Sequence, residues 1–524
     1  MERKYFPKVN ENKKIEYNDL AISVFGNRLY KDQTVYEYLI EFLLIFISPK
    51  ENENFEEGAF KFHTQKQIEN EELRYFSNPR IGFKRFIFFD KAKSENKFEI
   101  DRKAYKEMNN YLKEFIFDKG ASKEETLLII KDLFFGFSAV LKNRAWFAQS
   151  LLPLVPEMVL TESIGEKKER EDIKNYRCRY SDDSDCENCY EKSESFDWYT
   201  CDKKFNSNRH SFFARGGEVY YLHLLQGLDD ERREKLEKLL NKMLKNYPQF
   251  SKIADFIQNK WEDKITACRD NGGLKLKKLR LNGKLNFIPQ EYEVRSNYTY
   301  KELKNILSLE IDSLKKLELI SVGMFLQIFR MMHLRVSQER ALWILDFCGS
   351  DIVKKYAINS YKYLEQEIED ELRFSLESNE KLKNGVGDKT PLKLINESKE
   401  NSSKLIRKIG KEINLIIPQS GPGMRMTLDE ELVRFLVLSI VPPKKKIQFT
   451  TFLDEIFDHF GMVVGPKHFI KYVELKKEKN ALDNMGYFEK NQKEFEKLLR
   501  SCGFLRELSD ATSIIENSYE RVDI

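Results

Sequence analysis

Proline and glycine are scarce in this sequence. The 524 residues include 13 prolines and 23 glycines, whereas sandwiches and barrels use many such residues at their turns. Histidine is rarer still, with six residues and no H-E-x-x-H spacing that would hold a catalytic zinc on one helix. We therefore predict a mainly α fold with small β elements, divided among several domains because of the length of the chain.

A long uninterrupted apolar run is also lacking. The most apolar stretch, Val35–Ile47, is shorter than the roughly 20 residues that span a bilayer, and it carries Glu37 and Glu41 one helical turn apart. We predict a buried core helix here, stopped by Pro49. The polar N-terminal segment "MERKYFPKVNENKKIEYND" lacks an apolar core. We expect a cytoplasmic protein without a membrane anchor.

A strong excess of one charge is absent. There are 89 basic and 85 acidic residues, which gives a net charge of +4. This balance argues against a nucleic-acid coat protein, since such proteins carry a much larger positive excess. Any binding to nucleic acid must come from local basic patches.

Local patterns predict individual elements in the N-terminal third. Ser122 and Glu125 have the S-x-x-E spacing of a capping box at the start of a helix. The aromatic run "GFKRFIFFD", Gly82–Asp90, is short and bounded by turn residues, and we predict a strand there.

Four of the seven cysteines cluster within 24 residues, between Cys178 and Cys201. Cys186 and Cys189 have the C-x2-C spacing that supplies two zinc ligands from one turn. We predict a structural Zn2+ site, in which four protein ligands leave no open position for catalysis. His210 is an alternative to one outer cysteine, and a polar loop with incidental thiols remains the competing interpretation. The proposed metal ligands are Cys178, Cys186, Cys189 and Cys201.

A basic β-hairpin is predicted over Leu274–Pro289. Leucines alternate with basic residues on both sides of Asn282-Gly283, which is a favoured pair for a two-residue hairpin turn. A cationic two-stranded ribbon suits phosphate backbones, although an exposed hairpin that only adds solubility fits as well. The candidate contacts are Lys275, Lys277, Lys278, Arg280 and Lys284.

The last hundred residues have the layout of several short helices followed by a strand, a polar turn and a second strand. Phe488, Phe495 and Leu499 share one face of the last helix. This layout resembles a winged-helix domain. Immediately before its second helix, Lys444, Lys445 and Lys446 form a candidate phosphate clamp. The last helix mixes acidic and basic residues, as in winged helices that contact proteins.

Composition shifts and turn residues divide the chain into six segments. These are a helical N-terminal domain (1–160), a cysteine-rich zinc loop (161–215), a mixed α/β region with the basic hairpin (216–300), a helical domain (301–385), a linker (386–427) and the winged-helix-like domain (428–524).

Catalytic motifs are weak. "GVGDKTP", Gly385–Pro391, departs from the Walker pattern because Asp388 separates glycine from lysine. Glu474 and Lys476 form an E-x-K pair with Asp458 upstream. Metal-dependent nucleases place such carboxylates around Mg2+, usually from a strand, but the period here is helical. We expect that the chain is not an enzyme.

Two segments, "NRAWFAQSLLPLVPEM" and "NRHSFFARGGEVYYLHL", together with the C-terminal unit, are similar to uncharacterised subunits of bacterial DNA-restriction and phage-defence operons. The resemblance implies a non-enzymatic adaptor or scaffold subunit that binds DNA, a separately encoded ATPase or nuclease, or both. A purely structural assembly subunit and a metal-dependent nuclease with an unrecognised site are the alternatives.

Overall fold

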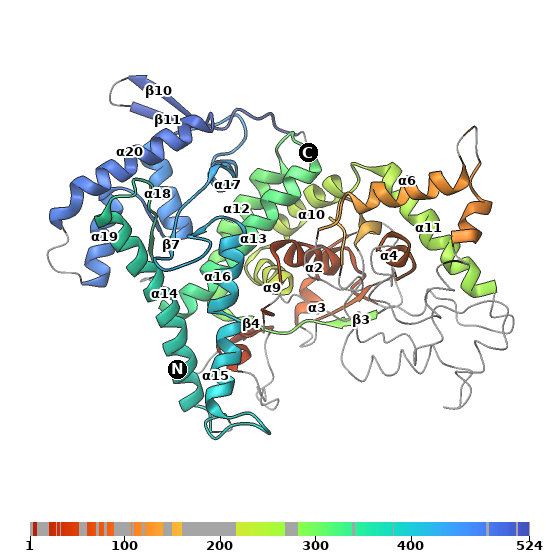
Figure 1. Cartoon of the computed structure of the whole chain (residues 1–524), viewed down its shortest axis with the longest axis horizontal. Coiled ribbons are helices and arrows are strands. Elements are labelled where there is room, and N and C mark those ends of the chain that lie inside the picture. The colour runs from red at the N-terminus through yellow and green to blue at the C-terminus, as the bar shows by residue number, and fades with distance from the viewer. Residues whose placement is uncertain are drawn as a thin grey trace. The chain divides into compact units, whose positions relative to one another are not determined.

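The computed structural model shows a mainly helical chain with short strands (Figure 1). The chain divides into two compact units. Unit 1 comprises Met1–Leu39, Ala214–Leu240 and Asn286–Ile524, and unit 2 comprises Ile40–Phe213 and Asn241–Leu285. The structure describes residues 4–7, 20–27, 29–31, 33–51, 60–69, 73–77, 81–88, 106, 109–117, 120, 122–139, 149–159, 216–267, 281–337, 341–380, 382–477, 482–509 and 512–522.

Unit 2 is built from helices with one small antiparallel sheet. The boundaries between the units fall within α2 (Val35–Ile47) and α10 (Asp230–Leu244). The apolar run predicted as a core helix is confirmed, because α2 spans the same residues and most of its side chains are buried. The other elements of unit 2 are α3 (Gln65–Glu69), β2 (Arg74–Ser77), α4 (Ile81–Phe88), α6 (Lys123–Phe135), η3 (Pro156–Met158), α11 (Pro248–Ala267) and β3 (Leu281–Lys284).

The predicted capping box is confirmed at the start of α6. The Ser122 side chain accepts from the Glu125 main-chain N–H, and the Glu125 carboxylate accepts from the Ser122 main-chain N–H. Two otherwise unpaired donors at the helix start are thereby satisfied.

The strand predicted over Gly82–Asp90 is wrong for the part that the structure describes, since Gly82–Phe88 lie in helix α4. Phe83, Phe86 and Ile87 are buried, and their i, i+3, i+4 spacing places them on one helical face. The Phe83 ring meets Phe134 of α6 edge-on at 5.1 Å. Packing against neighbouring helices therefore overrides the strand preference of the aromatic residues.

The hairpin turn predicted at Asn282-Gly283 is also wrong. Both residues lie inside β3, which pairs antiparallel with β2, so that Gly283 stands opposite Tyr75. The buried Tyr75 ring lies against the glycine, and a Cβ there would be 2.2 Å from the ring. Glycine is thus required at this position by an aromatic neighbour rather than by a turn.

Unit 1 contains most of the helices. Its first elements are β1 (Tyr5–Phe6), α1 (Leu20–Phe25) and α9 (Gly216–Gly227). They are followed by β4 (Ile288–Pro289), η6 (Gln290–Arg295), α12 (Ser296–Leu307), α13 (Ser313–Ser337), β5 (Trp343–Ile344), α14 (Asp351–Glu377), α15 (Pro391–Glu400), α16 (Ser403–Glu412), β6 (Ile416–Ile417) and β7 (Arg425–Met426). β1 pairs antiparallel with β4, and β6 pairs antiparallel with β7.

The segment predicted as a linker, 386–427, contains two helices and a strand pair. Leu394 and Ile395 of α15 and Ile406 and Ile409 of α16 are buried. The Thr390 side chain caps α15, with a proline at its first turn. The polar composition reflects helices that are apolar on one face only.

Helix α13 is long and apolar enough to cross a membrane by length and composition alone. However, 83% of its most apolar window is buried inside the protein. The central helix of a soluble domain has the same properties, so its hydropathy is weak support for a membrane span.

The C-terminal part of unit 1 alternates helices and short strands. Its elements are α17 (Glu430–Ile440), β8 (Lys446–Gln448), α18 (Phe449–Phe460), β9 (Met462–Val463), α19 (Pro466–Lys476), η8 (Leu482–Asn484), α20 (Met485–Ser501), β10 (Leu505–Ser509) and β11 (Thr512–Glu516). The two strands expected at its end are confirmed, as β10 pairs antiparallel with β11. β11 also pairs with β8, giving a three-stranded antiparallel sheet in the order β10-β11-β8.

Candidate functional site

Helix α20 exposes a row of basic side chains. Its buried face consists of Phe488, Asn491, Phe495 and Leu499, each fully buried. The basic residues follow one another at intervals of three, four and three positions. At 100° per residue they fall within an arc of about 80° on the face opposite the buried one. We call this row the basic stripe; it consists of Lys490, Lys493, Lys497 and Arg500, all exposed.

Two cations of the basic stripe are neutralised locally. Lys497 pairs with Glu494 at 2.8 Å, and Arg500 pairs with Glu507 of β10. Lys490 and Lys493 make no ion pair within 4.0 Å to any residue that the structure describes. These two ammonium groups are therefore the part of the stripe that is available to a ligand.

The predicted clamp at Lys444–Lys446 is only partly available. Lys444 pairs with Glu520, and Lys446 pairs with Glu516 at 3.1 Å. Glu516 also forms an ion pair with the guanidinium of Arg506 at 2.6 Å. Lys445 is exposed and has no ion pair among the residues described. Exposed pairs of this kind are weak, but they compete with phosphate for each lysine.

The hairpin residues do not form a described basic surface. Lys275, Lys277, Lys278 and Arg280 lie outside the described residues. Lys284 ends β3, where its main chain pairs with Arg74. Lys284 belongs to unit 2 and Lys444–Lys446 to unit 1.

The predicted zinc ligands Cys178, Cys186, Cys189 and Cys201 all lie outside the described residues, as does the alternative ligand His210. Within the described ranges, no group of three or more histidine, cysteine or acidic side chains is arranged to hold a metal ion. The zinc site therefore stays a prediction.

The E-x-K pair does not converge on a common site. Lys476 of α19 binds Glu367 of α14 at 3.0 Å, while Glu474 lies exposed on the same helix. Burial alone would raise the pKa of Glu367, but hydrogen bonds from His333, Ser337 and Lys476 hold that pKa at about 2. Lys476 thus serves as the partner of a partly buried carboxylate.

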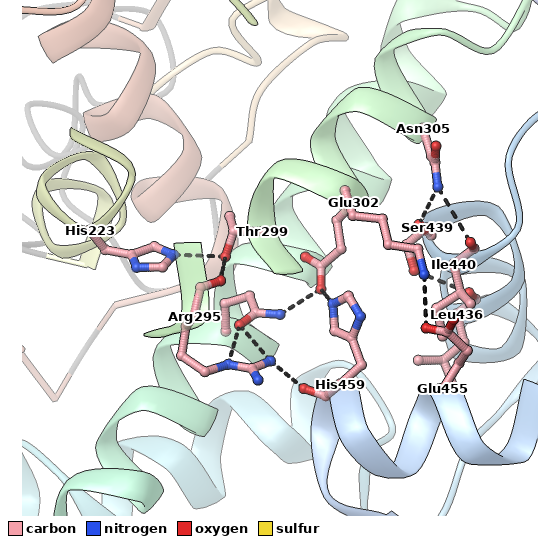
Figure 2. Close-up of polar contacts among 12 residues, drawn as sticks. His223, Arg295, Thr299, Glu302, Asn305, Leu436, Ser439, Ile440, Glu455 and His459 are labelled. Atoms are coloured by element: carbon pink, nitrogen blue, oxygen red, sulfur yellow. Dashed lines mark hydrogen bonds and ion pairs between the residues drawn. The ribbon is translucent and has the colours of Figure 1, made fainter. Parts of the chain in front are cut away.

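A second polar constellation lies deep inside unit 1, between α12, α13 and α18 (Figure 2). Glu302 of α12 accepts from Gln327 Nε2 at 2.5 Å, and its same oxygen lies 2.5 Å from His459 Nε2. Glu302 is 1% exposed and His459 is 0% exposed. We call this group the buried junction; it consists of Arg295, Glu302, Gln327, Arg330 and His459.

Main-chain carbonyls complete the buried junction. Arg295 donates to the carbonyl oxygen of His459, near the end of α18. A cation at this end also complements the helix dipole. Arg330 donates to the carbonyl of Ala341, and Asn305 donates to the carbonyl of Ser439 at 2.7 Å (Figure 2). The polar side chains therefore secure α12 and α13 to the ends of α17 and α18.

His223 is a core histidine with both ring nitrogens in hydrogen-bond contact. Its Nδ1 lies 3.1 Å from the carbonyl oxygen of Tyr292 and its Nε2 lies 2.7 Å from Thr299 Oγ1. Burial lowers its pKa to about 3, so the ring is neutral.

Neither group was predicted as a site from the sequence. The basic stripe had a usable signal, because its 3-4-3 spacing lies opposite Phe488, Phe495 and Leu499; the mixture of acidic and basic residues obscured it. The buried junction had no such signal, since Glu302 and His459 are 157 positions apart.

Comparison with known proteins gives no relatives for this chain. No protein-family model matches the sequence, no curated protein matches it, and no solved structure matches the fold.

Proposed function

We propose that this protein is a non-enzymatic adaptor subunit of a bacterial DNA-processing or phage-defence complex. In this role it binds duplex DNA through α20 and contacts a separately encoded ATPase or nuclease. It acts in the cytoplasm.

The observation that carries the proposal is the position of the basic stripe relative to the sheet. The order α17-β8-α18 followed by α20-β10-β11, with β11 between β8 and β10, is the order expected of a winged-helix domain. Helix α19 and β9 are additional to that simplest layout. Helix-turn-helix variants place their second helix of the pair in the major groove, and α20, directly before the β10–β11 hairpin, is the corresponding helix.

The charges on α20 support weak binding to DNA phosphates. Lysine ammonium groups neutralise DNA phosphates and release counterions, which makes binding dependent on salt. Within the stripe, only Lys490 and Lys493 lack an ion pair to a described residue, whereas Glu489, Glu494 and Glu496 flank it. We therefore expect weak duplex binding by the isolated protein and a larger contribution from its partners.

The test is titration of a labelled DNA duplex with the full chain, followed by fluorescence anisotropy at several salt concentrations. Lys490→Glu/Lys493→Glu should weaken binding at least tenfold and reduce the salt slope by about 2, because each lysine neutralises one phosphate in the wild-type complex. Lys354→Glu/Lys355→Glu is the matched control, since these lysines are exposed on α14 of the same unit and should leave binding nearly unchanged.

A specific observation favours the second candidate, a structural assembly subunit. Lys444, just before β8, and Lys446, the first residue of β8, are already paired with Glu520 and Glu516. Such pairing is expected of a surface that binds protein. If the wild-type chain fails to bind duplex at low salt, or if the α14 control weakens binding as much as the stripe variant, the DNA-binding proposal is wrong. Co-purification from nuclease-treated lysate then tests the assembly role.

A further inference from the structure

The carboxyl group of Glu302 is only half satisfied. Its Oε1 receives the Gln327 amide and contacts His459 Nε2, but its Oε2 has no hydrogen-bond partner in the described part of the chain. That oxygen faces α13 at Gly323, where an added Cβ would lie 3.5 Å from it. Burying an ionised carboxylate with an unpaired oxygen costs a large free energy, whereas burying a neutral carboxyl group costs much less.

Charged and titratable groups approach this carboxyl from several elements around it. Arg295 and Arg330 are buried and donate to carbonyl or amide oxygens rather than to a carboxylate. Lys301 is paired with Glu455 at 2.8 Å. The groups that act on Glu302 are Arg295 from η6, Lys301 from α12, His459 from α18 and Tyr220 from α9. Around them, Tyr298 acts on Arg295, and Arg330 from α13 acts on His459.

Burial outweighs the positive neighbours. Desolvation raises the pKa of Glu302 to about 8, although the Gln327 hydrogen bond and the charges of Arg295 and Lys301 oppose the rise. Burial lowers the pKa of His459 well below its usual value, and Arg295, Lys301 and Arg330 lower it further. At neutral pH the Glu302–His459 contact therefore joins two uncharged side chains.

We propose that the Glu302–His459 contact is a pH-responsive clamp, which holds α18 against α12 and α13 while Glu302 is neutral and weakens when Glu302 ionises. Because the raised pKa belongs to the folded state, the stabilisation is complete below the ordinary glutamate pKa and is lost as the pH rises towards about 8. Protonation of His459 changes the stability in the opposite direction, and it does so only below pH 6.5, the ordinary pKa of histidine. Above pH 6.5 the change of stability with pH therefore reports the ionisation of Glu302 and not the protonation of His459. The clamp is independent of DNA binding by α20.

Hydrogen–deuterium exchange of the full chain tests the clamp. Exchange in peptides from α12 and α18 is divided by that of unstructured reference peptides at the same pH, which removes the intrinsic effect of hydroxide. In the wild type the protection should fall about tenfold per pH unit above pH 6.5 and level off above about pH 8. In Glu302→Gln, a neutral isostere, protection should stay constant over the same range.

Glu377→Gln is the matched control, because Glu377 is exposed at the end of α14 and should keep the wild-type slope. The proposal is overturned by constant protection in the wild type, or by an equal slope in Glu302→Gln. It is also overturned if Glu302→Gln fails to fold at pH 6.5, since a neutral side chain of the same shape should preserve a contact made by a neutral glutamic acid.

Discussion

Asn491 of α20 donates a hydrogen bond to the main-chain oxygen of Leu345 at 2.9 Å. The same amide donates to the carbonyl of Val464, and its oxygen accepts from the N–H groups of Phe347 and Cys348. All four hydrogen-bonding positions of one fully buried amide are thus used. This side chain fixes the helix that carries the basic stripe to the segments that directly follow the paired strands β5 and β9.

Replacing Asn491 with leucine should therefore destabilise unit 1 strongly. The substitution leaves two main-chain carbonyls and two N–H groups unpaired in the interior, and we expect a loss of about 3–5 kcal/mol in the free energy of unfolding. Denaturant unfolding followed by circular dichroism measures the change. Glu489→Ala, on the exposed face of the same helix, should change stability by less than about 0.5 kcal/mol; equal effects of the two substitutions would contradict the role of Asn491.

Gly283→Ala should destabilise unit 2, because the new methyl group would press on the buried Tyr75 ring. We expect a loss of about 1–3 kcal/mol, as for other overpacked interiors. Gly486→Ala is the control, since an added Cβ there meets nothing within 4 Å and alanine favours the α20 helix. A Gly283→Ala protein as stable as the wild type in thermal unfolding would show that the ring moves aside easily.

Glu367 should contribute stability that disappears in acid. Its folded-state pKa of about 2 lies below the ordinary value, so the contribution is complete above the ordinary glutamate pKa and is lost as the pH falls towards 2. At neutral pH, Glu367→Gln should lower the free energy of unfolding by about 1–3 kcal/mol, allowing for partial exposure. Denaturant titrations of both proteins from neutral pH down to about pH 2.5 measure the difference. A difference that does not shrink with acid would exclude the ion pair with Lys476 as its source.

The cysteine cluster should carry one structural zinc ion. Elemental analysis of the purified chain is expected to give about one zinc per molecule, and Cys186→Ser/Cys189→Ser should remove it. Cys348→Ser is a suitable control, because Cys348 lies outside the cluster and contacts Ser350. A content below about half a zinc per wild-type chain would eliminate the site and leave the loop without a metal.

Local signals in the sequence were sufficient where one segment determines its own structure. The apolar run of α2, the capping box of α6 and the β10–β11 hairpin follow from neighbouring residues alone. Local signals predicted the wrong structure where contact with a distant segment determines it. Gly283 belongs to a strand because Tyr75 lies across it. Gly82–Phe88 is helical because α4 packs against α6 and α11.

The candidate sites differ in the same way, because one lies within a single helix and the other joins distant segments. The basic stripe is periodic within a single helix and was accessible to sequence reasoning, whereas the Glu302–His459 contact required knowledge of which helices meet. The balance of ion pairs at Lys444 and Lys446 likewise depends on Glu520 and Glu516, whose proximity comes from the chain returning along β11.

The division of unit 1 into three separate stretches of sequence bears on how the protein is made. Ser23 of α1 and Ser375 of α14 share a hydrogen bond across 352 positions of the chain. At about 5–20 residues per second, a ribosome needs roughly 20–70 s to make the intervening polypeptide. During that interval the apolar side chains of α1 lack the α14 surface on which they finally pack. Unit 2 is completed earlier, so we expect the packing of α1 against α14 to be a late step in folding.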